Sequence, residues 1–181
     1  MKIQNARLLF IFISVITGLS VAMRFLPHSY NFVPVGALAL FSGTYIRSKW
    51  GVLMPVAAMA VTDVFIGWHN IVLFTWGSYA VIGMIGWWVR QKPNVLKIAA
   101  GTVSGSVIFY LLTNFAVWAW TPLYQKTWAG LIQSYVMAVP FYRNTFFGDL
   151  FYVAVFFGVY QAAVYLVAKR AESRKPFAHI S

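Results

Sequence analysis

The chain has 181 residues and a formal net charge of +11, and 61% of its residues are hydrophobic, 19% aromatic and only 9% charged. This composition is typical of integral membrane proteins and excludes an ordinary soluble domain. The absence of cysteine excludes disulfides, cysteine zinc sites and thiol nucleophiles, and no GxxxxGK[ST] loop is present for ATP hydrolysis. We therefore expect one all-α transmembrane domain over residues 1–181.

Six apolar segments are candidate membrane spans, at about residues 8–26, 33–46, 51–68, 71–89, 98–120 and 145–168. In the first segment Ser14, Gly18 and Ala22 recur at every fourth position. Such a ridge of small residues lets another helix approach closely. It can serve packing within the protein or contact with a partner helix.

The second segment is short and contains Pro34, Gly36 and Gly43. Short membrane segments interrupted by glycine or proline often line a cavity, because irregular backbone is tolerated there.

The third segment carries Asp63, one of only three acidic residues in the chain. An ionisable side chain at membrane depth indicates a functional site, unless it is a structural partner of a cation. The candidate cations are Arg24 and Arg143. If the helix continues through its end, Asp63, Gly67 and Asn70 share one face.

The longest connection follows the fifth segment and contains residues 128–139, in which polar and apolar residues mix as in a helix lying at a membrane interface. We expect Pro140 to end this short helix, the last span to begin at about residue 145, and residues 169–181 to form a basic tail.

The basic residues define an orientation. Eleven of the fourteen Lys and Arg residues lie in the two terminal segments and in the second and fourth connections. By the positive-inside rule these parts face the cytoplasm, so both termini are expected on the cytoplasmic side of the membrane. The net charge is then a sign of topology, and no nucleic-acid partner is expected.

The polar and aromatic side chains gather at the opposite ends of the predicted spans. This predicts an outward-facing pocket for a small molecule, with no catalytic residues, no metal and no cofactor. The expected binding residues are Asn31, Phe32, Asp63, Trp68, His69, Asn70, Asn114, Trp118, Tyr142, Arg143, Asn144 and Asp149. It stays open whether His69 or His28 ligates a metal-containing ligand.

Four stretches carry a resemblance to a known family. They are NFVPVGALALFSG at 31–43, TDVFIGWH at 62–69, NFAVW at 114–118 and VPFYRNTFFGDLFY at 139–152. The chain resembles an uncharacterised family of six-span bacterial membrane proteins, which in turn is similar in fold to the substrate-binding S components of energy-coupling-factor transporters.

That resemblance implies an S-component-like bundle that binds a vitamin or related micronutrient, with energy supplied by separate ATPase subunits. It also implies that Ser14, Gly18 and Ala22 dock a transmembrane coupling protein.

Two other functions remain open. The first is an accessory or assembly subunit without a ligand, whose polar layer only locks the helices together. The second is an intramembrane enzyme that uses Asp63 and Asp149, with His69, as acid–base or metal-binding groups.

Overall fold

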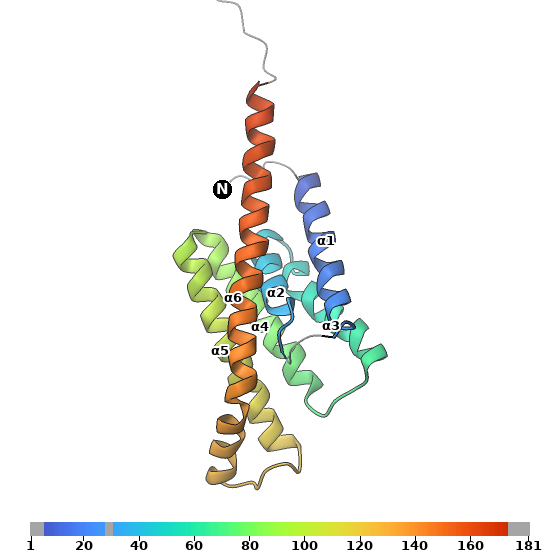
Figure 1. Ribbon diagram of the computed structural model, residues 1–181, viewed down its shortest axis with the longest axis vertical. Helices are drawn as coiled ribbons and strands as arrows, with labels where there is room; N and C mark the ends of the chain where they lie inside the picture. Colours follow the sequence, from blue (N-terminus) through green and yellow to red (C-terminus); the bar gives the residue numbers. More distant parts are fainter. Residues whose placement is uncertain (1–5, 28–30, 174–181) are drawn as a thin grey trace, which may run out of the picture.

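The computed structural model describes residues 6–27 and 31–173, and every regular element within these ranges is an α-helix (Figure 1). The helices are α1 (Ala6–Met23), α2 (Val35–Tyr45), α3 (Trp50–Ile66), α4 (Val72–Gln91), α5 (Val95–Trp120) and α6 (Trp128–Ser173). The all-helical class expected from the sequence is confirmed.

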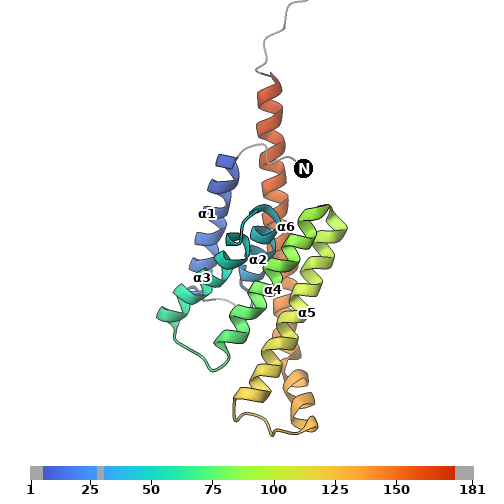
Figure 2. The same cartoon turned by 180° about the vertical axis from the view of Figure 1, so that it is seen from behind.

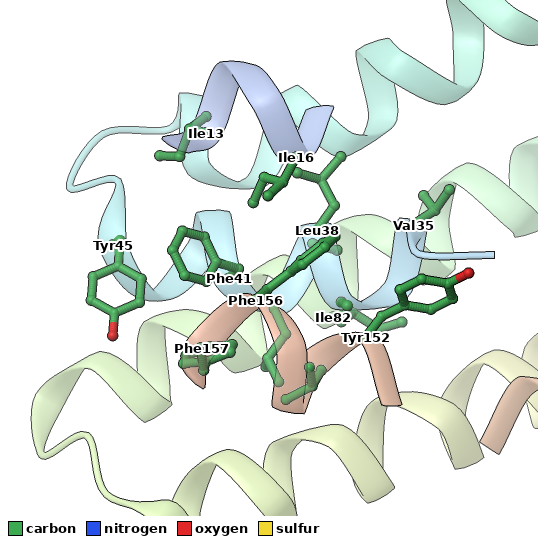
Figure 3. Packing of buried hydrophobic residues seen from close by; sticks show 14 of the residues in the cluster. Ile13, Ile16, Val35, Leu38, Phe41, Tyr45, Ile82, Tyr152, Phe156 and Phe157 are labelled. Atoms are coloured by element: carbon green, nitrogen blue, oxygen red, sulfur yellow. The ribbon is translucent and has the colours of Figure 1, made fainter. Parts of the chain in front are cut away.

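Helix α2 is the centre of the bundle, and all five other helices contact it. Every one of its 11 residues is buried, because its sequence is apolar on all sides. Figure 3 shows its side chains in the core between α1 and α6. The labelled members of this core are Ile13, Ile16, Val35, Leu38, Phe41, Tyr45, Ile82, Tyr152, Phe156 and Phe157.

Glycines let α2 and α4 approach until their backbones touch. A Cβ atom added to Gly43 would lie 2.0 Å from the carbonyl oxygen of Gly83, and one added to Gly86 would lie 2.7 Å from the carbonyl oxygen of Leu40. Neither distance leaves room for a side chain. Small residues are what allow such close helix contact.

A proline in α3 is compensated by a serine of α2. Pro55 has no N–H to bond to the carbonyl oxygen of Gly51, four residues earlier. The hydroxyl of Ser42 donates to that oxygen instead, at 2.6 Å. The buried carbonyl oxygen is thereby satisfied, and this bond between Ser42 and Gly51 holds α3 against α2.

Four helices, α1, α4, α5 and α6, are long and apolar enough to cross a membrane. With 11 and 17 residues, α2 and α3 are shorter. At 1.5 Å per residue α2 measures about 16 Å, roughly half the hydrocarbon thickness of a bilayer.

Two expectations about helix ends are wrong. The stretch 128–139 is not a separate interfacial helix, since α6 runs without a break from Trp128 through Pro140 to Ser173 and includes residues 169–173 of the expected tail. Its first turns pack on α5, where the Tyr110 hydroxyl donates to the carbonyl oxygen of Tyr135 at 2.7 Å. Packing of this kind maintains a helix that loses one hydrogen bond at proline.

Helix α3 also ends earlier than expected, at Ile66. Gly67 has a φ of 118°, a conformation that side chains rarely adopt, and it turns the chain away from the helix axis. Asn70 therefore does not share a helix face with Asp63.

The helices alternate in direction. In Figures 1 and 2 the start of α1, the α2–α3 and α4–α5 turns and the last part of α6 face the same way, and α6 extends well beyond the other helices. The α1–α2, α3–α4 and α5–α6 connections lie toward the other end.

Candidate functional site

A cavity of about 460 Å³ opens between the helices. Asn31 and Val33 of the α1–α2 connection and His69 and Ile71 of the α3–α4 connection contribute to its walls. The cavity therefore lies toward the end of the bundle opposite the described chain ends.

Two helical stripes form much of the cavity wall. On α5 they are Tyr110, Thr113, Asn114 and Val117, and on α6 Ala138, Phe141, Tyr142 and Thr145. Both sets have the spacing i, i+3, i+4, i+7, which places them on one helix face. The rings of Tyr110 and Tyr142 join the two stripes, with centroids 4.7 Å apart.

Several polar groups of this wall have capacity left for a ligand. The amide nitrogen of Asn114 donates to the carbonyl oxygen of Tyr110 at 2.8 Å, so its side-chain oxygen remains an acceptor. The hydroxyl of Thr113 donates to Phe109 O at 2.7 Å and keeps its lone pairs. Tyr79 is buried in the opposite wall and makes no hydrogen bond with any other described residue.

Asp63 is paired with Arg24. Its Oδ1 lies 2.6 Å from Arg24 Nη2, and its Oδ2 accepts a hydrogen bond of 2.8 Å from Trp76 Nε1. Arg24 also donates to the hydroxyl of Thr62 and, at 3.3 Å, to the carbonyl oxygen of Met59. Of the two arginines considered from the sequence, Arg24 is thus the partner.

Of this ion pair, only Arg24 lines the cavity. The Asp63 side chain is 1% exposed and takes no part in the cavity wall. A paired, hydrogen-bonded carboxylate in this position holds α1, α3 and α4 together.

Of the twelve residues expected to bind a ligand, four line the cavity: Asn31, His69, Asn114 and Tyr142. Phe32 instead packs on Tyr152 of α6, with ring centroids 5.5 Å apart. Trp68 is 66% exposed and contacts Trp76.

The remaining expected residues lie elsewhere. Trp118 donates its Nε1 hydrogen to Gln125 O at 2.9 Å. Asn70 and Arg143 are exposed and Asn144 is half-buried, and none of the three lines the cavity. His28 lies outside the described residues.

Asp149 is buried and lines two much smaller cavities, of about 10 and 20 Å³. The larger of these shares Asn31, Val33, Tyr79, Phe109 and Thr145 with the 460 Å³ cavity, so the two adjoin. Within residues 6–27 and 31–173 no three His, Cys, Asp or Glu side chains lie close enough to hold a metal ion.

Sequence reasoning missed several residues that line the cavity, above all Tyr79, Tyr110 and Thr113. A usable signal was present, because polar and aromatic residues recur at helical spacing along 110–117 and 138–145. A mixed stripe of this kind on an apolar helix has the composition of a ligand-pocket wall.

The ridge of Ser14, Gly18 and Ala22 is exposed on α1. Nothing among the described residues lies within 4 Å of a Cβ atom added to Gly18. The ridge therefore takes no part in packing within this portion of the chain.

A family model described as "Family of unknown function (DUF6580)" matches residues 3–173. Neither the curated proteins nor the solved structures contain a match to the chain. Since the family model covers nearly the whole sequence, the chain belongs to the DUF6580 family.

Proposed function

We propose that this protein is the substrate-binding subunit of an uptake transporter for a vitamin or related micronutrient, located in the bacterial cytoplasmic membrane. The observation that carries the proposal is the 460 Å³ cavity walled by aromatic rings, hydroxyls and an amide. Its volume falls within the range of about 300–1,000 Å³ found for small-molecule sites.

In this proposal the cavity opens to the outside and both termini face the cytoplasm. The cavity lies at the end of the bundle opposite the basic α2–α3 and α4–α5 turns, which contain Arg47, Lys49 and Lys92. Basic turns on the cytoplasmic side agree with the positive-inside rule.

All six helices would then cross the membrane region, α2 without touching lipid. Complete burial among the other helices is the condition under which a short helix is tolerated at membrane depth. Energy would come from ATPase subunits on other chains, because the sequence has no phosphate-binding loop.

The direct test is to purify the protein in detergent and identify any small molecule that co-purifies, by mass spectrometry after denaturation. A panel of vitamins is then screened for an increase in melting temperature. Binding of one compound at a one-to-one ratio is expected. If no compound co-purifies or stabilises the protein, the ligand-free accessory subunit becomes the better explanation.

A variant that fills the cavity locates the binding site. Ala138 lines the cavity and is 8% exposed, so Ala138→Phe puts a ring into that space without removing a polar group. We expect loss of ligand binding with little change in the melting temperature of the ligand-free protein. Val159→Phe, at an exposed position of the same helix, is the matched control and should bind normally. Normal binding by Ala138→Phe would place the ligand elsewhere.

The exposed ridge on α1 gives the proposal a second test, because a coupling protein would need close helix contact there. Gly18→Leu is expected to leave ligand binding and folding intact and to abolish uptake, measured with radiolabelled ligand in cells. Unchanged uptake would exclude this ridge as the docking site.

The two-carboxylate enzyme is disfavoured by the arrangement of the acidic groups. Both oxygens of Asp63 bond to Arg24 and Trp76, and none of the three cavities of about 460, 20 and 10 Å³ is lined by both Asp63 and Asp149. Acid–base chemistry needs both groups within reach of one substrate.

A further inference from the structure

Asp149 is the one described acidic residue that is buried without a partner. The residue is 6% exposed, and no cation or hydrogen-bond donor among the described residues pairs with its carboxyl group. A buried carboxylate in an apolar helix bundle is costly unless something neutralises it. The groups around Asp149 therefore indicate what kind of group would pair with its carboxylate.

The carboxyl group lies directly against the first turn of α2. A Cβ atom added to Gly36 would lie 2.3 Å from Asp149 Oδ1 and 3.0 Å from its Cγ atom. Gly36 is the second residue of α2, where the helix dipole carries a partial positive charge of about half a unit. This position favours the ionised carboxylate but does not balance its full charge.

An unused hydroxyl lies beside the same space. Ser20 and Ser78 are buried helical serines whose hydroxyls donate to a carbonyl oxygen one turn earlier, both at 2.7 Å. Ser106 is equally buried, yet its Oγ has no hydrogen-bond partner in the described part of the chain. Ser106 and Asp149 line the same cavity of about 10 Å³, together with Thr102.

The oxygens around this cavity match the ligands of a small, hard cation. Carboxylate and hydroxyl oxygens suit such ions, and the Thr102 hydroxyl, which donates to Ile98 O at 2.8 Å, keeps its lone pairs. A space of about 10 Å³ holds one water-sized particle. A quaternary ammonium or a guanidinium group is too large for it.

We propose that Asp149 and Ser106 form a binding site for a small monovalent cation, either a metal ion such as Na⁺ or the primary ammonium group of a bound molecule. The neighbouring 20 Å³ cavity links Asp149 to the large cavity and gives either kind of cation a way in. The ammonium form rests on the proposed function, whereas the metal-ion form does not.

The test measures the melting temperature of the purified full-length protein in detergent. Choline chloride in the buffer is replaced stepwise by sodium, potassium or methylammonium chloride at constant total salt. At least one small cation should raise the melting temperature in a saturable way, by about 5–10 °C at a hundredfold excess over its Kd. A response to Na⁺ or K⁺ identifies a metal-ion site, and a response to methylammonium alone identifies an ammonium site.

Three variants assign the response to these residues. Asp149→Asn should abolish it, and Ser106→Ala should raise the half-saturating concentration about fivefold, the effect of one lost hydrogen bond. Ser20→Ala removes a buried serine whose hydroxyl is already bonded within α1, and it should respond like the unmodified protein.

The proposal is overturned if none of the three cations stabilises the protein relative to choline, which would mean that Asp149 is held in its neutral, protonated form. It is equally overturned if Asp149→Asn responds as the unmodified protein does. Should Asp149→Asn fail to fold, the unmodified protein and Ser106→Ala decide the question. A metal-ion response also stands if no organic ligand is ever found, so the two proposals can fail separately.

Discussion

At the scale of single residues, the two buried aspartates have opposite environments. Both Asp63 oxygens are occupied, by Arg24 and by Trp76, whereas Asp149 has no partner among the described residues. The same residue type is thus paired with a cation in one place and left without a partner from the described residues in the other. The difference comes from the neighbouring segments, because the turn after α1 and helix α4 supply the donors to Asp63.

Removing the charge of Asp63 should destabilise the protein whether or not a ligand is present. Asp63→Asn leaves the Arg24 guanidinium without its counter-ion, and we expect a loss of about 3–5 kcal/mol. Thermal unfolding in detergent measures this loss. Arg143→Gln, at an exposed arginine, is the control and should change little.

A second variant separates pairing from other effects of the mutation. Arg24→Met combined with Asp63→Leu removes both charges. The double variant should therefore lose much less free energy of unfolding than the sum of the losses in the two single variants. An unchanged melting temperature for Asp63→Asn, or simple additivity in the double variant, would contradict a structural role of the pair.

At the scale of helices, backbone contacts decide which substitutions the bundle accepts. Gly43→Ala should cost about 1–3 kcal/mol, because its Cβ would meet the Gly83 carbonyl at 2.0 Å and the two helices would have to separate. Gly77→Ala on α4 is the matched control, since nothing lies within 4 Å of its added Cβ among the described residues. The control should be neutral or stabilised by up to about 1 kcal/mol. Equal effects at both glycines would show that α2 and α4 do not touch as described.

The link between α2 and α3 gives another prediction at this scale. Ser42→Ala leaves the Gly51 carbonyl without a donor and should cost about 1–3 kcal/mol. Adding Pro55→Ala returns a backbone N–H to α3, so the double variant should recover part of the loss. Thermal unfolding of the two variants tests this, and a double variant no more stable than Ser42→Ala would rule out the compensation.

At the scale of the whole molecule, the alternating helices predict which connections face each side of the membrane. Reporters fused after Ser181 and inserted in the α4–α5 turn, after Lys92, should be active only in the cytoplasm. One inserted in the α5–α6 connection, after Tyr124, should be active only outside. Alkaline phosphatase and green fluorescent protein fusions measure the two outcomes. An external signal after Ser181 would reverse the orientation and turn the cavity toward the cytoplasm.

The sequence by itself determined the helical class, the approximate place of all six helices and the shortness of the second one. These features follow from local composition and from the period of apolar residues, which each segment carries without reference to its neighbours. The charge difference between the two ends of the bundle could also be predicted locally, because the Lys and Arg residues concentrate in the terminal segments and in two of the connections. Asp63 could be singled out for the same reason, as a lone carboxylate in an apolar segment.

Only the tertiary structure decided which side chains meet. The partner of Asp63, the unpaired state of Asp149 and the walls of the cavity depend on the rotation and spacing of helices that are distant in the sequence. The continuity of α6 through Pro140 likewise depends on its packing against α5, since a proline alone favours a helix end. Aromatic residues at helix ends look alike in sequence whether they face lipid or a cavity, so Trp68 and Tyr142 could be told apart only by their neighbours in the fold.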